Sequence, residues 1–347
     1  QRVALVTFSS INDYQSLSEN IDYQVVPSRF TPSVLSKSTT DLVCLQRFIN
    51  DFQADIIHSH LWESEILLTQ VNVGKAIRFS HFHDNMVQLK KLKLPNNKKD
   101  VTDYYEKNIV VKSYKSTNHF FICISKDTLN YARNVLNKKL HAKIFTLNNA
   151  INFSNFNLKK DALSETISLI NIGSFVPKKN QKMAIDIVNV LKKEHLKVKL
   201  TFLGDGPLRK ELEQYAQELN LSENIIFKGN VNNVEHYLKS STIFLHTAIY
   251  EPFGLVILEA MAAGLPVVSL DGKGNRDIIK NGENGYILRD QDPLEFANKI
   301  QMLFNNKEKY FEISKNGIES AKKYDIKNYG EKLISLYSES ISSTKQV

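Results

Sequence analysis

The chain has 347 residues, of which 42% are hydrophobic and 10% aromatic, so it can bury a large apolar interior and exceeds the size that one core usually serves. No stretch approaches the roughly 20 consecutive apolar residues that cross a bilayer, and the first residues lack the order of a signal peptide, so we expect a cytoplasmic protein. The formal charge of +8 indicates an acidic partner, for which nucleic acid, an anionic membrane surface and a phosphorylated small molecule are candidates.

Apolar runs alternate with amphipathic stretches along the first half, a pattern typical of βα units that build a parallel sheet. Each predicted strand there ends in a polar tip. The predicted strands span residues 3–8, 55–60, 76–83, 119–125 and 143–149. The spacing of apolar residues predicts helices over residues 41–52, 62–73 and 126–140.

A second alternating series follows the polar segment 152–166, which we interpret as a linker. Its predicted strands span residues 168–173, 199–204, 225–229, 243–248, 266–270 and 285–288. Helices are predicted over residues 181–194, 207–219, 234–239 and 254–263. The domains are therefore expected at 1–155 and 156–325, followed by a helical segment at 326–347. Open sheets of this kind bind ligands at the carboxyl ends of their strands.

The segment EPFGLVILEAMAAGLPVVS, residues 251–269, places two glutamates on one loop and helix. If the helix begins at Gly254, Glu251 lies on the preceding loop and Glu259 about two turns along the helix. The free amides of Gly254 and Leu255 then form an anion site at the helix N-terminus, which can hold a pyrophosphate without a metal. A carboxylate further along can accept hydrogen bonds from a ribose diol. The residues alone leave open an ordinary βα turn with solvated glutamates.

The same segment resembles the Glu-x7-Glu signature of retaining GT-B glycosyltransferases of family 4, the group 1 transferases of capsule, lipopolysaccharide and exopolysaccharide synthesis. The resemblance continues, in the order that the family shows, through GSFVPKKNQ, FLGDGP, IFKGNV, DGKGNRDII and ENGYIL. It is looser in the first half, at DIIHSHLW, RFSHFHD, FICIS and TLNNAIN. It implies a fold of two Rossmann-like βαβ domains that face a central cleft, with the donor bound by the second domain and the acceptor by the first. It also implies that a C-terminal helix, residues 326–347, crosses back to the N-terminal domain.

The resemblance also implies roles for individual residues. Glu259 corresponds to the ribose ligand and Glu251 to the residue near the sugar and phosphates, with backbone contacts from Phe253, Gly254 and Leu255. Lys179 falls where the family places a lysine on the donor diphosphate.

Three further positions are expected to contact the donor. Gly204 ends a predicted strand at a sharp turn, and Val231 falls where family members line the base. Ser174 stands where the family often has an arginine, and this departure leaves two alternatives for the diphosphate clamp. Either Lys178 or another cation substitutes for the arginine, or the clamp relies more on Lys179 and the helix N-terminus.

Four histidines, at positions 58, 60, 81 and 83, fall at the ends of two predicted strands. Histidine titrates in the range that is useful for orienting or deprotonating an acceptor hydroxyl. The resemblance implies this catalytic role for His83 first and for His81 second. A structural role in the core and a zinc site are the alternatives. We do not expect a metal here, because three or four convergent imidazoles with no thiolate are an unusual ligand set.

Two other features bear on partners. The basic stretch LKKLKLPNNKK, residues 89–99, is either a solvated loop or a peripheral contact with an anionic membrane at the cytoplasmic face of the inner membrane. Family members begin with a strand, a glycine-rich loop and a long helix. Here residues 3–8 resemble their second strand, which implies that the first βα unit is missing from this sequence or has been lost.

The expected reaction transfers a hexose or N-acetylhexosamine from a nucleoside-diphosphate sugar to a hydroxyl of a glycan or a lipid-linked oligosaccharide. The anomeric configuration is expected to be retained, and the nucleoside is expected to be uridine or guanosine. No cofactor and no metal are expected. An epimerase of the same fold and an inactive, donor-binding partner subunit are the alternatives. Nucleic acid is not expected as a partner, because no aromatic and basic motif accompanies the positive charge.

Overall fold

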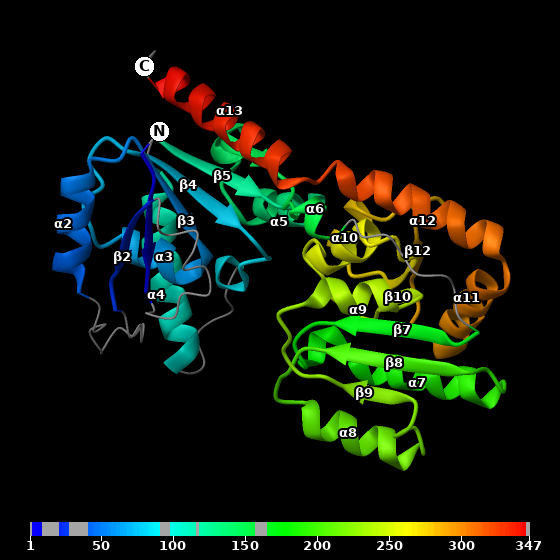
Figure 1. The fold of residues 1–347 in the computed structure, drawn as a ribbon. Helices are drawn as coiled ribbons and strands as arrows, with labels where there is room; N and C mark the ends of the chain where they lie inside the picture. The colour runs from blue at the N-terminus through cyan, green and yellow to red at the C-terminus, as the bar shows by residue number, and fades with distance from the viewer. Residues whose placement is uncertain are drawn as a thin grey trace. The chain divides into compact units, whose positions relative to one another are not determined.

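The computed structural model describes residues 2–8, 21–27, 41–90, 98–115, 118–156 and 165–344, and the chain divides into two compact units. The first unit comprises Gln1–Ile124, Thr128–Thr146 and Ile334–Val347. The second comprises Ser125–Asp127 and Leu147–Leu333. Each unit is built on its own parallel sheet (Figure 1).

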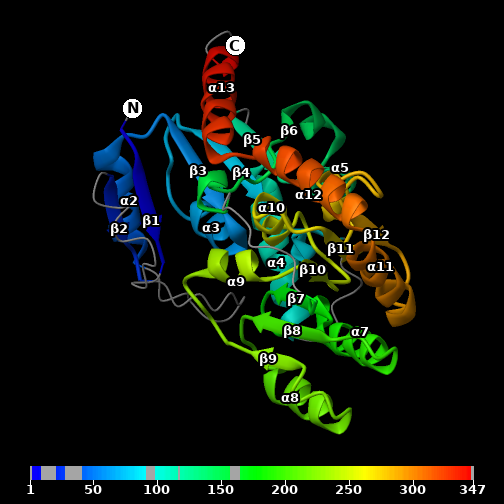
Figure 2. The ribbon, with the colours of Figure 1, turned by 45° about the vertical axis from the view of Figure 1, so that its right-hand side comes forward.

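The first unit contains a four-stranded parallel sheet in the order β3-β4-β5-β6 and a separate parallel pair, β1 and β2. The strands are β1 (Ala4–Thr7), β2 (Asp22–Val25), β3 (Ile56–His60), β4 (Ile77–Phe82), β5 (His119–Cys123) and β6 (Ile144–Thr146). The helices are α2 (Leu42–Phe52), α3 (Leu61–Leu68), α4 (Lys98–Ser113) and α5 (Lys126–Val135). Figure 2 shows α2 beside the β1–β2 pair, and its Leu45 packs there with Val26 and Leu67.

Alternation along β3 and β4 separates two polar groups on opposite faces of the first sheet. Ser59 pairs in register with Ser80, and both hydroxyls donate hydrogen bonds to the buried carboxyl group of Glu65 on α3. Because successive side chains point to opposite faces, the neighbouring pair His60 and His81 lies on the other face. The sheet therefore presents His60 and His81 on the face away from Glu65, whereas His119 of β5 contacts the Ser80 hydroxyl on the Glu65 face.

The second unit has a six-stranded parallel sheet in the order β12-β11-β10-β7-β8-β9. Its strands are β7 (Ile167–Ile172), β8 (Val198–Leu203), β9 (Ile225–Phe227), β10 (Ile243–His246), β11 (Val267–Leu270) and β12 (Tyr286–Leu288). Its helices are α6 (Phe153–Phe156), α7 (Gln181–Lys193), α8 (Arg209–Glu218), α9 (Val234–Ser240), α10 (Leu255–Ala262), α11 (Pro293–Asn305) and α12 (Lys307–Lys322). Figure 1 shows β7, β8 and β9 side by side in the second unit, with α8 beyond β9.

The core of the second unit explains why the sequences of its central strands are continuous apolar runs. Leu200 and Phe202 of β8 and Leu169 of β7 are buried against the apolar stripe of α7, which includes Ile187 and Leu191. Helices cover both faces of a parallel sheet, so its strands have no solvent face and need no polar alternation.

The last helix, α13 (Ile326–Thr344), begins in the second unit and ends in the first. From Ile334 onward it belongs to the first unit, where the Tyr337 ring lies 5.0 Å from the ring of Phe79 on β4. None of the described helices combines the length and the apolar character that crossing a membrane requires.

All eleven predicted strands are confirmed to within two or three residues at their ends, and each predicted helix corresponds to an observed one. The elements β2, α4, α6, α11 and α12 were not predicted from the sequence. Residues 9–20, which follow β1, lie outside the described residues, as do Lys91 and Lys93 of the basic stretch.

Candidate functional site

The centre of the candidate site is a pair of opposite charges in the second unit. The Lys179 Nζ atom donates a hydrogen bond of 2.7 Å to the Glu251 Oε2 atom. The two side chains are 20% and 10% exposed. A pair this well shielded from water requires that both partners be held in place, because an unpaired charge at such depth costs several kcal/mol.

The backbone around Lys179 holds it against the loop after β10. The Ile249 amide donates to the Lys178 carbonyl at 2.9 Å, and the Thr247 hydroxyl donates to the Lys179 carbonyl at 3.1 Å. The strand order places β7 beside β10, so the loops that follow these strands leave the sheet at the same edge. This adjacency brings residues 72 positions apart in the chain into hydrogen-bonding contact.

A second loop, residues 271–277, supports Glu251 from the other side. The Glu251 amide donates to the Gly272 carbonyl at 2.9 Å, and the Gly274 amide donates to the Glu251 carbonyl at 3.0 Å. A Cβ atom on Gly274 would stand 1.9 Å from the Pro252 carbonyl oxygen, so only glycine fits there. The buried Asn275 side chain fastens this loop, because its Oδ1 accepts from the Gly272 amide and its Nδ2 donates to Ser269 and Leu270.

The charge on Glu251 is stabilised by its neighbours. Burial raises its pKa, but His246 and Lys179 outweigh this and lower the pKa to about 2. The His246 Nε2 atom lies 3.3 Å from the Glu251 Oε2 atom without hydrogen-bond geometry, so we attribute more of the effect to Lys179 at 2.7 Å. Glu251 is therefore an ionised carboxylate throughout the physiological range.

The helix α10 begins directly after this carboxylate. Gly254 is its N-cap residue, with a φ of 107° that favours glycine, and no side chain caps the helix. The amides of Leu255 and Val256 have no acceptor within the described residues. The Phe253 side chain is buried and packs edge-on against Tyr324, so only its backbone faces the turn. Free amides at a helix N-terminus are suited to bind an anion.

Glu259 lies in the second turn of α10 and is partly exposed. Burial raises its pKa to about 7. Its carboxyl group has no hydrogen bond or ion pair with any residue that the structure describes. A half-buried carboxylate without a partner is costly, and its oxygens remain available to accept hydrogen bonds from a ligand.

The loops after β7, β8 and β9 provide the remaining predicted donor positions. The Gly204 amide donates to the Gly229 carbonyl at 2.8 Å, and a Cβ atom on Gly204 would stand 2.3 Å from the Gly173 carbonyl oxygen. Val231 is partly buried two residues after Gly229. Ser174 is exposed, and its carbonyl accepts a hydrogen bond from Gln181. The strand order β10-β7-β8-β9 therefore aligns Glu251, Lys179, Ser174, Gly204 and Val231 along one edge of the sheet.

The predicted acceptor histidines lie in the first unit. His81 is fully buried, whereas His83 is partly exposed and hydrogen-bonded to His60, with 2.7 Å between His83 Nε2 and His60 Nδ1. Burial lowers the pKa of His83, and burial together with the neighbouring histidines lowers that of His81 further. Of the two, His83 is the one that a ligand could reach.

The sequence analysis missed two residues that hold the Glu251 loop, His246 and Asn275. His246 is the last residue of β10, so its place at a strand end was the available signal. Asn275 lies in the DGKGN loop, where nothing in the sequence shows that a polar side chain points inward.

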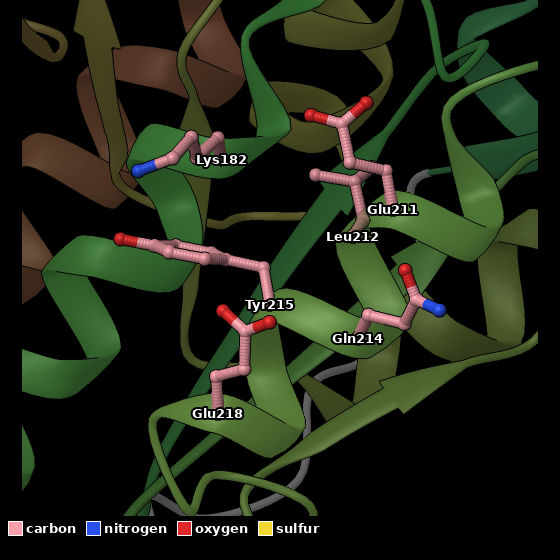
Figure 3. A pocket seen from close by; sticks show the side chains of 6 residues that line it. All are labelled: Lys182, Glu211, Leu212, Gln214, Tyr215 and Glu218. Carbon is pink, nitrogen blue, oxygen red and sulfur yellow. The ribbon is translucent and has the colours of Figure 1, made fainter.

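A separate surface pocket of about 120 Å³ lies between α7 and α8 (Figure 3). It contains none of the predicted site residues. Figure 3 shows Lys182 facing Tyr215, whose ring centroid is 3.7 Å from the Lys182 Nζ atom. The lining residues are Lys182, Glu211, Leu212, Gln214, Tyr215 and Glu218.

Comparison with known proteins identifies the class to which this site belongs. Residues 154–320, which contain Lys179, Glu251 and Glu259, match the family described as glycosyl transferases group 1. This match covers slightly less than half of the chain, and the two Rossmann-like units have the GT-B fold.

Individual relatives are distant. The capsular polysaccharide biosynthesis glycosyltransferase CapH of Staphylococcus aureus is 27% identical over 264 residues, 73% of this chain and 70% of CapH. The poly(ribitol-phosphate) alpha-N-acetylglucosaminyltransferase of Staphylococcus aureus is 28% identical over 205 residues, 58% of this chain and 41% of that protein. The crystal structure of Anabaena HepE in complex with UDP and glucose superposes with a TM-score of 0.77 at 18% identity, covering 96% of this chain and 91% of HepE. The chain spans about half the length of the first curated relatives that it matches.

Proposed function

We propose that the protein is a retaining glycosyltransferase of bacterial surface polysaccharide synthesis that takes its sugar from a nucleoside diphosphate. The observation that carries the proposal is the Lys179–Glu251 pair at the free N-terminus of α10, with the unpartnered Glu259 further along the same helix. The arrangement offers a cation, free amides and a carboxylate acceptor in the order in which a diphosphate and a ribose would meet them.

Each group has a chemical task in this proposal. Lys179 has three donors and gives one to Glu251, so its ammonium group retains donors for the leaving diphosphate. The amides of Leu255 and Val256 address the same phosphates through the dipole of α10. Glu259 accepts both hydroxyls of the ribose. Since these groups neutralise the diphosphate, donor binding needs no metal ion.

Sugar transfer is proposed to occur on one face of the donor. The ionised Glu251 lies beside the phosphate-binding amides, where it can accept hydrogen bonds from sugar hydroxyls. The departing phosphate takes the proton of the acceptor hydroxyl, so the configuration is retained without a covalent enzyme intermediate. His83 is proposed to orient the acceptor, and His81 to support it from the interior.

The proposed donor and acceptor are based on the ligands and the names of the similar proteins. HepE was crystallised with UDP, glucose and UDP-glucose, and TarM with UDP, which favours a uridine-linked donor over a guanosine-linked one. CapH is named for capsular polysaccharide biosynthesis, which favours a glycan or lipid-linked acceptor. Peripheral membrane contact through the basic stretch 89–99 is part of this proposal, and pelleting with anionic vesicles tests it.

Product analysis tests the proposed reaction. The protein is incubated in EDTA with UDP-glucose or UDP-N-acetylglucosamine and a mixture of short glycan acceptors, and the anomeric signals of the product are read by NMR. Transfer with retained configuration is expected, and Glu319→Ala, an exposed glutamate on α12, serves as the control that leaves it unchanged. An inverted product refutes the mechanism. Epimerised donor without transfer supports the epimerase, and binding without turnover supports the inactive partner subunit.

A further inference from the structure

Four histidines on one face of the first sheet form a close cluster. His58 and His60 are two residues apart on β3, and His81 of β4 pairs in register with His60. His83 follows two residues after His81 on the same face. Their ring centroids lie between 4.2 and 5.1 Å apart for neighbouring pairs. Two parallel strands, each with a His-x-His sequence at its carboxyl end, create this arrangement.

The interior of the cluster contains ring nitrogens without partners. His81 is fully buried, and neither of its nitrogens has a hydrogen-bond partner; the buried His58 Nε2 atom also has none. One ring nitrogen from each of His58, His60 and His81 lies within 4.8 Å of the other two. Buried polar atoms are nearly always satisfied, so unpartnered buried nitrogens of His58 and His81 that converge with the exposed His60 ring indicate a missing ligand.

The Nδ1 atoms of His58 and His60 each have a partner outside the group of three. His58 Nδ1 lies 2.5 Å from the Tyr337 hydroxyl, and His60 Nδ1 lies 2.7 Å from His83 Nε2. These contacts fix the orientation of the His58 and His60 rings and leave the Nε2 atom of each available to a ligand. Metal-ligating histidines are held in the same way, with the second nitrogen bonded to an outer group.

We infer that His58, His60 and His81 bind one divalent transition-metal ion, Zn²⁺ before others, with His83 and Tyr337 as the groups that orient the ligands. Neutral imidazoles suit Zn²⁺, and three of them leave a fourth position open to water. Tetrahedral Zn²⁺ with bonds of 2.0–2.1 Å places ligand nitrogens about 3.4 Å apart, so the rings close by roughly an ångström around the ion.

This inference is independent of the proposed donor site, because the donor groups lie in the other unit, but it shares His81 and His83 with the proposed acceptor site. The test uses the full chain without a histidine tag, stripped with EDTA, dialysed and titrated with Zn²⁺ by calorimetry. Co²⁺ titration followed by visible absorption reports the coordination geometry. One equivalent of each ion is expected to bind.

Variants locate the ion. His60→Ala changes an exposed side chain, so it is expected to fold as the parent does while losing at least about 100-fold in Zn²⁺ affinity. Tyr337→Phe keeps the ligands and loses about 10-fold. His236→Ala, an exposed histidine on α9, is the matched control and binds as the parent does.

Two outcomes overturn the inference. The first is that the metal-free parent binds no stoichiometric Zn²⁺. The second is that His60→Ala and His58→Asn bind Zn²⁺ as tightly as the parent does, while each retains the circular dichroism spectrum of the parent. His60→Ala is expected to bind UDP in EDTA as the parent does, so a loss of Zn²⁺ binding can be distinguished from a failure of the proposed donor site.

Discussion

Replacing Glu259 by glutamine is predicted to stabilise the protein while weakening donor binding. Burial raises the Glu259 pKa to about 7 from its ordinary value of 4.5, so the folded state holds this proton more tightly than the unfolded state. Ionisation of Glu259 therefore does not lower the free energy of unfolding below pH 4.5. The free energy of unfolding falls as the pH rises from 4.5 to 7, and the full loss is reached above pH 7. At about 1.36 kcal/mol per pH unit the cost is at most about 3 kcal/mol, and partial exposure of the side chain reduces it.

Urea unfolding at pH 5 and pH 8 measures this effect. The free energy of unfolding of Glu259→Gln is expected to exceed that of the parent at pH 8 by about 1 to 3 kcal/mol and to match it within about 1 kcal/mol at pH 5. The same variant is expected to bind UDP at least about 10-fold more weakly at pH 8. Glu319→Gln, the exposed control on α12, shifts neither quantity. A Glu259→Gln variant that is less stable than the parent at pH 8 refutes the reasoning, because the carboxylate would then have a partner in the folded state.

Three further changes test the scaffold of the site. Lys179→Met leaves Glu251 buried without its cation and is expected to lower the free energy of unfolding by about 3 kcal/mol at pH 7. The Glu251 pKa is lowered to about 2, so the parent loses this stabilisation as the pH falls from 4.5 toward 2. The free energy of unfolding of the variant is therefore expected to fall less steeply with pH in this range. Gly274→Ala forces a Cβ atom against the Pro252 carbonyl and is expected to cost more than about 2 kcal/mol in urea unfolding, whereas Gly330→Ala, with open space around a helical glycine, gains about 0.5 to 1 kcal/mol. Asn275→Ala removes three hydrogen bonds of a buried amide, and a thermal-shift measurement showing no loss of stability contradicts the account of that loop.

Much of the fold follows from the sequence because parallel strands buried on both faces give continuous apolar runs. The strands β7, β8 and β10 were predicted for this reason, and their helices showed a clear apolar stripe. The helix α4 was missed because its sequence has almost no apolar periodicity. The strand β2, DYQV, is partly exposed throughout and has no apolar run to reveal it.

The site was predictable only as far as its residues lie in one motif. Glu251, Gly254 and Glu259 are close in sequence, so the spacing alone placed them on one loop and helix. The partnership of Glu251 with Lys179 depends on the adjacency of β7 and β10, and the support from Asn275 depends on a loop that folds back. Neither is encoded in local sequence, and only the resemblance to a family indicated that Lys179 would be near.

For the histidine cluster, the positions of the residues were predictable from the sequence but their chemistry was not. Its four members were visible at two strand ends, but their chemistry depends on which ring nitrogens already have partners. The hydrogen bond between His58 Nδ1 and the Tyr337 hydroxyl, 279 residues apart in the chain, occupies the outer nitrogen, while the buried Nε2 atom has no partner. A metal was not expected from the sequence because a ligand set of imidazoles alone is unusual, and the long-range contacts that favour one are not visible in the sequence.

Calorimetric titration of the parent protein and Glu259→Ala with UDP, GDP, ADP and CMP in EDTA tests the central claim most directly. The account predicts that a nucleoside diphosphate, UDP before GDP, binds the parent without metal and loses at least about 10-fold in affinity in Glu259→Ala, which corresponds to about 1.4 kcal/mol. If none of the four nucleotides binds the parent, or if Glu259→Ala binds as tightly as the parent does, the assignment of the donor site to Lys179, Glu251 and α10 is contradicted.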